Sequence, residues 1–172
     1  TEKLILHSMH QSVTRLHSVL CAVFQLEPEQ LQIIVRDIGG GFGTKVAVHP
    51  EDILVVYAAK KLKRPVKWTA TRTEEFQASV HGRDQRNYAE LAFDATGKIL
   101  AVRVHTLANT GAHLTNPALL IPLGLMSKVI TSVYHIPVMY LDTKCVLTNT
   151  APIGAYRGAG RPEGIYPMER LM

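Results

Sequence analysis

Two glycine-rich segments carry the residues whose types and spacing best suit chemistry. The first, residues 39–45, reads GGGFGTK. Consecutive glycines cost conformational entropy on folding, and one use that offsets this cost is a backbone that approaches a ligand closely and points its N–H groups at oxygen atoms. The run matches neither a phosphate-binding loop, in which Gly-Lys precedes Ser or Thr, nor a dinucleotide-binding GxGxxG. A tight turn between a strand and a helix is the alternative, and the run by itself favours the turn.

The second segment, residues 155–163, reads AYRGAGRPE. Arg157 and Arg161 flank small residues immediately before an expected helix. The planar guanidinium fork suits phosphate or metal-bound oxygen, and the start of a helix favours an anion. An exposed loop, with arginines that are solvated or paired with Glu163 and Glu169, is equally compatible with this segment.

The other reactive residue types form no recognisable catalytic or metal motif. The eight histidines include the closely spaced His7, His10 and His17, but no carboxylate completes a metal set, and neither HExxH nor GxSxG occurs. We expect surface or hydrogen-bonded histidines. Cys21 and Cys145 form no CxxC, which excludes a disulfide-dense secreted module and a cysteine zinc site. Both cysteines are expected to be small core residues.

Composition limits the class of protein. The 172 residues are 47% hydrophobic and 19% charged, which indicates a globular protein rather than a disordered one. No apolar run reaches the roughly 18 residues of a membrane span, and no signal peptide is visible. The formal charge of +5 comes from scattered basic residues, which argues against nucleic-acid binding. We expect a cytoplasmic protein, and the first and last residues suggest a piece of a longer chain.

Hydrophobic spacing predicts the elements that position the two glycine-rich segments. Strands and helices alternate irregularly and include one hairpin, which predicts an α+β fold with mixed sheets, an antiparallel hairpin and packed helices. The first segment follows a strand, and the second precedes the last helix. The expected helices cover 13–24, 50–62 and a stretch from about 162, with 116–128 irregular or weakly helical; the expected strands cover 4–6, 31–36, 65–69, 88–93, 99–107 and 139–147.

This assignment also predicts which side chains are buried and which are exposed. We expect the second helix to bury the stripe formed by Ile53, Leu54, Tyr57, Ala58 and Leu62. Trp68 is expected in the core, and residues 60–67 are expected to form a solvated basic face.

The order of the motifs along the chain resembles a known family. The motifs occur in a fixed order after the first expected strands: GGGFGTK, a helix opening with HPED, KRPVKW, TRTEEF, a hairpin with DATGKI, ANTGAH and TNTAPIGAYRGAGRPE. This order resembles the molybdopterin-binding large subunit of the xanthine dehydrogenase/aldehyde oxidase family, in the AYRGAGR variant close to carbon monoxide dehydrogenase large chains. The resemblance covers about Leu31 to Arg170 and extends more loosely upstream. It implies that residues 1–172 are a fragment of the molybdenum cofactor-binding domain of a longer large subunit.

The resemblance also implies a cofactor and a reaction. The cofactor is molybdenum-molybdopterin, often in the cytosine dinucleotide form in bacteria. Such proteins hydroxylate a carbon of a small molecule, such as an aldehyde or an N-heterocycle, with oxygen derived from water. They pass electrons to iron–sulfur clusters and FAD on partner domains or subunits, which implies a hetero-oligomer. The glutamate general base is expected outside this chain, and no metal ligand is assigned within it. The cofactor-binding residues implied by the match are Gly41, Phe42, Gly43, Tyr156, Arg157 and Gly158.

Three departures from the family pattern bear on the substrate. Val46 replaces a glutamate, and Ala159 replaces a ring-stacking phenylalanine, of xanthine-oxidising members, which disfavours a purine. Gly158 replaces the cysteine of copper-containing carbon monoxide oxidisers, so no copper thiolate can form there. The alternative function is a cofactor-free α+β scaffold or subunit-assembly module whose strands pair with partner subunits.

Overall fold

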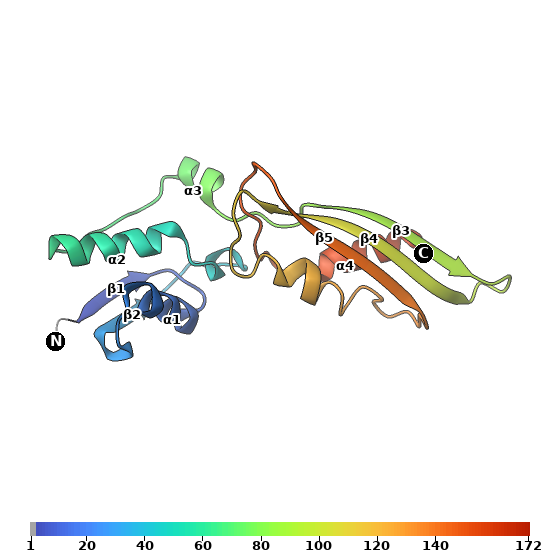
Figure 1. Cartoon of the computed structure of the whole chain (residues 1–172), viewed down its shortest axis with the longest axis horizontal. Helices are drawn as coiled ribbons and strands as arrows, with labels where there is room; N and C mark the ends of the chain where they lie inside the picture. The colour runs from blue at the N-terminus through green and yellow to red at the C-terminus, as the bar shows by residue number, and fades with distance from the viewer. Residues whose placement is uncertain (1–2) are drawn as a thin grey trace. The chain divides into compact units, whose positions relative to one another are not determined.

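A computed structural model describes residues 3–172 and divides the chain into two compact units, Thr1–Gln77 and Ala78–Met172 (Figure 1). Both units combine helices with a small sheet, which confirms the predicted α+β class. Each unit has its own core and its own glycine loop, and each is described by itself.

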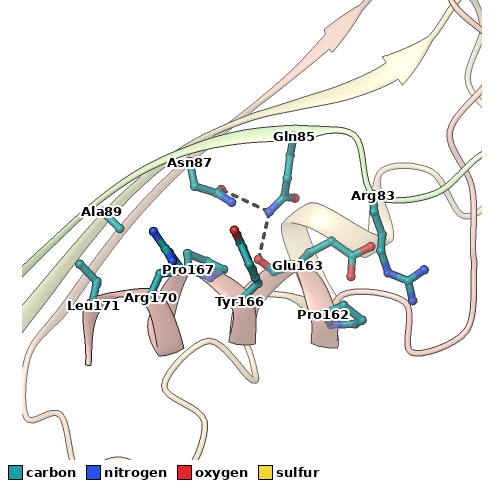
Figure 2. Close-up of a pocket in the computed structure, with 10 residues that line it drawn as sticks. All are labelled: Arg83, Gln85, Asn87, Ala89, Pro162, Glu163, Tyr166, Pro167, Arg170 and Leu171. Carbon is teal, nitrogen blue, oxygen red and sulfur yellow. Dashed lines mark hydrogen bonds between the residues drawn. The ribbon is translucent and has the colours of Figure 1, made fainter.

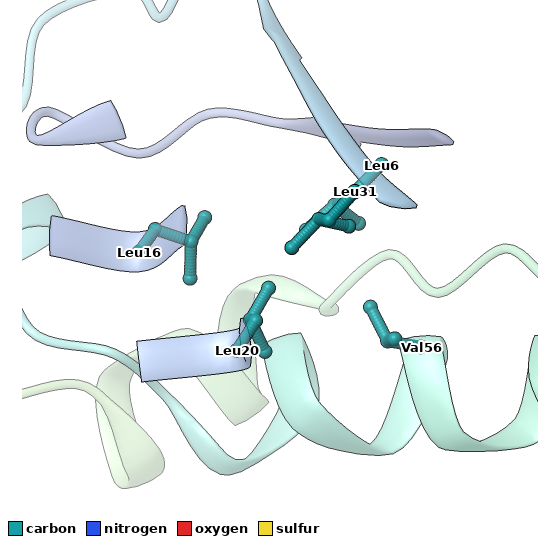
Figure 3. Packing of buried hydrophobic residues seen from close by; sticks show 5 residues of the cluster. All are labelled: Leu6, Leu16, Leu20, Leu31 and Val56. Atoms are coloured by element: carbon teal, nitrogen blue, oxygen red, sulfur yellow. The ribbon is translucent and has the colours of Figure 1, made fainter. Parts of the chain in front are cut away.

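The first unit is built on one strand–helix–strand unit. β1 (Leu4–Ser8) and β2 (Leu31–Val35) pair in parallel, and α1 (Val13–Phe24) connects them, as parallel neighbours require a crossover. A short 3₁₀ turn (η1, Pro28–Gln30) precedes β2. α2 (Pro50–Leu62) begins at a proline, which is favoured in the first helical turn because the missing N–H would have no partner there. The core consists of Leu6, Leu16, Leu20, Leu31 and Val56 (Figure 3).

The second unit is a three-stranded mixed sheet with a helix on one face. β3 (Gln85–Phe93) is antiparallel to β4 (Ile99–Gly111), and β4 is parallel to β5 (Met139–Leu147). The connection between β4 and β5 includes a π-helical turn (η3, Ile121–Leu125). α4 (Arg161–Leu171) runs along the sheet in Figure 1. Its Met168 packs in a buried cluster with Val102, Val104 and Ile130.

Most predicted elements are confirmed, but the last part of the first unit differs from the prediction. Residues 65–69 form no strand, because they find no partner strand in the described chain and an unpaired strand is not stable. A helix that we did not predict, α3 (Arg72–Ala78), follows. Its start is a capping box, in which Glu74 N–H donates to Thr71 Oγ1 and Thr71 N–H donates to Glu74 Oε2.

The predicted buried stripe of α2 is wrong at Leu54, Tyr57 and Leu62, which are exposed. Ile53 does pack against the core, and Val56, which was not predicted, retains only 4% of its accessible surface. The helix is apolar on several sides, so spacing alone could not select the face that packs against the core of the first unit. The core position predicted for Trp68 is also wrong, because 49% of the side chain is exposed. The basic face is confirmed: Lys60, Lys61, Lys63, Arg64 and Lys67 are all exposed.

Within residues 3–172, none of the helices combines the length and the apolar character needed to cross a membrane.

Candidate functional site

The first glycine loop lies between the end of β2 and a 3₁₀ turn (η2, Thr44–Val46) that leads into α2. It reverses the chain through left-handed backbone, with φ of +50° at Phe42 and +102° at Gly43. The Thr44 N–H and hydroxyl both donate to the Gly41 carbonyl, at 2.9 and 2.8 Å. The Lys45 ammonium donates back to the Ile38 carbonyl. Because this cation is engaged by the loop itself, the polar groups that the loop presents outward are mainly backbone groups.

Gln11, in the turn before α1, supports this loop from outside. Its Oε1 accepts a hydrogen bond from Gly43 N–H at 2.9 Å, and its own N–H donates to the Lys45 carbonyl at 2.8 Å. The carboxamide fills the space that a Cβ on Gly41 would need, so a side chain at this position would displace Gln11 from the loop. The sequence analysis missed Gln11, because the only signal was a polar residue before a helix cap, which is common in proteins.

His10 places a second polar group beside Gln11. The side chain is 4% exposed, and its Nδ1 accepts a hydrogen bond from Ser12 N–H at 2.9 Å. The ring proton therefore lies on Nε2, which is buried and bonds to no group among residues 3–172. A buried donor without an acceptor costs free energy, so an acceptor supplied from elsewhere would be stabilised at this position.

The outer part of the first loop is exposed backbone and one aromatic ring. Gly39 and Gly40 are exposed, and their N–H groups donate to no group in the part of the chain that the structure describes. The Phe42 side chain is 55% exposed. A Cβ on Gly40 would meet the Phe42 ring at 2.9 Å, so the ring lies close over the glycine backbone. Unpaired N–H groups without side chains suit an oxygen-rich anionic ligand.

The second glycine loop, residues 148–160, lies between β5 and α4. Gly158, Ala159 and Gly160 all have positive φ, at +98°, +21° and +91°. Ala159 N–H donates to the Tyr156 carbonyl at 2.8 Å, and Arg161 N–H donates to the Gly158 carbonyl at 3.1 Å. These bonds make a compact double turn that directs the Tyr156 and Arg157 side chains outward, where both are exposed.

The two carboxylates considered as partners for the arginines each bond to another group. Glu163 Oε2 accepts a hydrogen bond from Gly160 N–H at 2.8 Å and so caps the first turn of α4. Glu169 Oε2 accepts a hydrogen bond from the Tyr134 hydroxyl at 3.0 Å, which raises the pKa of Tyr134.

Residues 80–83 hold the second loop from one side. His81 N–H donates to the Pro152 carbonyl at 2.9 Å, and Gly154 N–H donates to the His81 carbonyl at 2.8 Å. The Arg83 guanidinium lies 4.8 Å from the centre of the Tyr156 ring and donates to the Arg157 carbonyl. The sequence analysis did not assign a role to this segment, in which Arg83 lies 74 residues before its partner Arg157.

A groove of about 670 Å³ opens between β3 and α4 beside this loop. Gln85 spans it and donates to the Glu163 carbonyl at 3.0 Å and to Asn87 Oδ1 at 3.2 Å (Figure 2). These bonds tie the start of α4 to β3. The lining residues are Arg83, Gln85, Asn87, Ala89, Pro162, Glu163, Tyr166, Pro167, Arg170 and Leu171.

The cysteines and histidines provide no second reactive centre. Burial raises the pKa of both the Cys21 and Cys145 thiols, with Glu27 and Glu29 adding to the effect at Cys21. A raised pKa lowers the thiolate fraction, which is the reactive form. Both cysteines are partly buried rather than fully buried as core residues. Among residues 3–172, no three His, Cys, Asp or Glu side chains are grouped closely enough to hold a metal ion.

Comparison with known proteins identifies the family. The family model of the molybdopterin cofactor-binding domain matches residues 1–172. The chain belongs to this family. A curated relative, the nicotine 6-hydroxylase large subunit of Paenarthrobacter nicotinovorans, is 38% identical over 143 residues, which are 82% of this chain and 18% of that protein. The carbon monoxide dehydrogenase large chain of Afipia carboxidovorans is 36% identical over 174 residues, which are 99% of this chain and 21% of that protein.

A solved structure supports the same assignment. Quinoline 2-oxidoreductase from Pseudomonas putida 86 has a TM-score of 0.93 and 35% identity, with 98% of this chain and 22% of that chain covered. The predicted resemblance to the xanthine dehydrogenase/aldehyde oxidase family is therefore confirmed. The chain spans about a fifth of the length of the curated relatives.

The structure collects the six predicted cofactor-binding residues into two sets. Gly41, Phe42 and Gly43 form one loop of the first unit, and Tyr156, Arg157 and Gly158 form one loop of the second. Their role in cofactor binding stays a prediction. The local chemistry of each loop fits a molybdopterin group, because each offers side-chain-poor backbone to an anionic, oxygen-rich ligand.

Proposed function

We propose that this chain is part of the large subunit of a molybdenum hydroxylase and that both glycine loops bind its molybdopterin cofactor. The observation that carries the proposal is the match of the molybdopterin cofactor-binding family to the whole chain, residues 1–172. When bound, the cofactor supplies the two-electron oxidation of a carbon centre with oxygen from water. The chain's own residues bind and orient it.

The first loop contributes neutral donors. The Gln11 carboxamide holds Gly43 and leaves no room for a side chain on Gly41, so this backbone stays open to the ligand. Fixed N–H dipoles stabilise negative charge without reorganising. Phe42 adds an exposed ring that lies close over the Gly40 backbone.

The second loop contributes positive charge. Arg157 lies exposed at the tip, and its planar guanidinium suits paired oxygens better than an ammonium does. Gly158 beside it has no side chain that could compete for the ligand. We assign the cofactor-binding role to Tyr156, Arg157 and Gly158 on this basis.

We further propose an N-heterocycle as the substrate class. Two proteins that resemble this chain at 35% identity or more are named for nicotine and quinoline, which are both nitrogen heterocycles. Carbon monoxide is disfavoured, although the carbon monoxide dehydrogenase large chain is 36% identical, because Gly158 provides no thiolate for copper. Ala159 leaves space where a bulky ring would narrow the site.

The complete protein is proposed to work in a cytoplasmic hetero-oligomer. The relatives are a "large subunit" and a "large chain", which supports separate partner subunits. The iron–sulfur clusters and FAD are placed on partner domains or subunits, as the family resemblance implies. The cytosine dinucleotide form of the cofactor is the form we expect.

The test uses the complete protein, expressed with its partner subunits. Metal analysis and pterin fluorescence should show about one molybdenum and one pterin per large subunit. Nicotine, quinoline, an aromatic aldehyde and carbon monoxide are then compared as substrates in isotopically labelled water, and we expect labelled product from a heterocycle. A folded complex without molybdenum or pterin would favour the alternative of a cofactor-free assembly module.

A double variant tests the loop assignment. Phe42→Ala with Arg157→Ala should lower molybdenum content and activity by about tenfold or more, because it removes the exposed ring and the charge. Phe93→Ala with Arg86→Ala is the matched control, since both side chains are exposed on β3 and neither residue belongs to a glycine loop. Equal molybdenum content in both double variants would show that these loops do not bind the cofactor.

A further inference from the structure

We propose that Arg83 is a positioning residue that sets the geometry of the Tyr156–Gly158 segment. The inference deepens the proposed function, because it concerns the loop to which we assign cofactor binding. Arg83 lies outside both glycine motifs, in the short segment between α3 and β3. It makes two contacts with the loop, one with a side chain and one with the backbone.

The two contacts fix two consecutive residues of the loop. The Arg83 guanidinium lies over the Tyr156 ring with 4.8 Å between its Cζ and the ring centre. A nitrogen of the same guanidinium donates to the Arg157 carbonyl. One planar group thus holds the orientation of the tyrosine ring and the peptide plane that follows Arg157, and it restricts where the Arg157 side chain can point.

Lysine could not replace this arrangement. A guanidinium is planar, stacks on an aromatic face and still has donors in its plane, whereas an ammonium is a compact charge that cannot do both from one position. Arg83 is also adjacent to Pro162 and Glu163, at the end of the groove in Figure 2. A Cβ on Gly158 would lie 3.6 Å from its Nη2, so the guanidinium packs closely against this part of the loop.

The backbone conformation of Gly82 and Arg83 allows this segment to lie close to Tyr156. Arg83 has a φ of +62°, a left-handed conformation that is uncommon for a residue with a side chain and that persists where the surroundings enforce it. A Cβ on the preceding Gly82 would lie 2.8 Å from Tyr156 Cβ, so glycine is required for the tyrosine to come this near. The backbone hydrogen bonds of His81 with Pro152 and Gly154 then fasten the two segments together.

The test compares Arg83→Ala and Arg83→Lys with Arg86→Ala and Arg86→Lys in the complete protein with its partner subunits. Arg86 is a matched control, because it is an exposed arginine three residues away on β3. The first readout is hydrogen exchange of peptides that cover residues 155–161, measured on protein prepared without molybdenum. We expect exchange at least about fivefold faster in both Arg83 variants and unchanged exchange in both Arg86 variants.

The second readout is made on the molybdenum-loaded complex. Both Arg83 variants should retain less molybdenum after extended dialysis and show a changed Mo(V) resonance spectrum, while the thermal midpoint stays close to that of the Arg86 variants. A merely structural role would lower the thermal midpoint without changing the spectrum of the retained metal. If Arg83→Ala does not fold, Arg83→Lys distinguishes the positioning role from a structural role, because it keeps the charge and the aliphatic stem.

The outcomes separate this inference from the proposed function. A wild-type complex that binds no molybdenum overturns the proposed function, and the exchange measurement then still decides the role of Arg83. Wild-type exchange and a wild-type spectrum in Arg83→Lys would overturn the positioning role, even in an active molybdenum enzyme.

Discussion

The two glycine loops present similar surfaces but are supported in different ways. The first is held by side chains that reach its backbone: Gln11 bonds to Gly43, and Lys45 bonds to Ile38. The second is held by the Arg83 and Glu163 side chains and by close packing of its glycines against neighbouring residues. A Cβ on Gly160 would lie 2.7 Å from Leu125 Cβ and 2.8 Å from Met126 N. Both loops therefore use hydrogen bonds, but the crowded glycine of the first, Gly41, faces the end of a flexible side chain, whereas Gly160 faces Leu125 Cβ and backbone atoms of its neighbours.

This difference predicts opposite sensitivities. Added atoms should damage the second loop most at Gly160, because its nearest neighbours, Leu125 Cβ and backbone atoms of residues 125 and 126, cannot move aside without shifting the backbone. Removed atoms should damage the first loop most, because each lost hydrogen bond leaves a polar group without a partner.

The largest effect is expected for an added methyl group in the second loop. Gly160→Ala forces a positive φ of +91° on alanine and places its Cβ against Leu125 and Met126. Strain and overpacking together should cost about 3 kcal/mol or more. The soluble yield and thermal midpoint of the complete protein measure this effect.

Gly39→Ala is the matched variant in the first loop. Gly39 also has a positive φ, at +65°, but a Cβ there meets nothing within 4 Å. Only backbone strain should remain, at about 1 kcal/mol. If the two alanines lower the thermal midpoint equally, the packing argument for the second loop is wrong.

The next effect is expected for a removed carboxamide in the first loop. Gln11→Ala leaves the Gly43 N–H without its acceptor and opens a void beneath Gly41, which should cost about 2 kcal/mol locally. We expect faster hydrogen exchange over residues 39–46 and a several-fold loss of molybdenum content. Gln11→Glu keeps an acceptor oxygen and the side-chain volume, so the loop should keep its protection from exchange. Normal molybdenum content in Gln11→Ala would contradict this account.

Sequence could predict the parts of the fold that depend on local chemistry. The hairpin turn from Asp94 to Gly97 is correctly placed, because an aspartate acceptor and a glycine at positive φ specify the turn within a few residues. The capping box that begins α3 at Thr71 is equally local and could have been found. The family resemblance located both glycine loops, because the order of their motifs is specific.

The supports of the loops could not be predicted in the same way. Gln11 and its partner Gly43 are 32 residues apart, and Arg83 and its partner Arg157 are 74 residues apart. Neither residue has a distinctive local pattern, since a polar side chain before a helix and an arginine before a strand occur in many proteins. Only the folded chain brings these pairs together. The prediction of the buried face of α2 failed for a related reason, because Val56 is buried by residues that are distant in sequence and close in space.

A smaller effect is expected at the cap of α4, where the second loop does use a side chain. Glu163→Ala removes the acceptor of the Gly160 N–H and should cost about 1 kcal/mol. Glu163→Gln keeps an acceptor oxygen and should behave nearly as wild type. The comparison of thermal midpoints sharpens the contrast between the loops: an Ala effect larger than that of Gly160→Ala would mean that hydrogen bonding, not packing, dominates the second loop as well.

The smallest effect is expected at a turn that belongs to neither loop. Asp94 Oδ1 accepts hydrogen bonds from the Thr96 hydroxyl, the Thr96 N–H and the Lys98 N–H, and these bonds lower the pKa of the carboxyl group. A lowered folded-state pKa means that the charged form contributes stability above the ordinary pKa of aspartate, and that this contribution is lost as the pH falls through the folded-state value. Protection of residues 94–98 from exchange, corrected for the intrinsic rate, should therefore decrease as the pH falls below the ordinary aspartate pKa of about 3.9. Asp94→Asn keeps an acceptor but cannot titrate, so its protection should not change over this range.

Because this turn has no role in our proposal, Asp94→Asn should bind molybdenum as wild type does at neutral pH. A loss of molybdenum in Asp94→Asn would show that cofactor content responds to any weakened turn, and the contrast between the two loops would then lose its meaning.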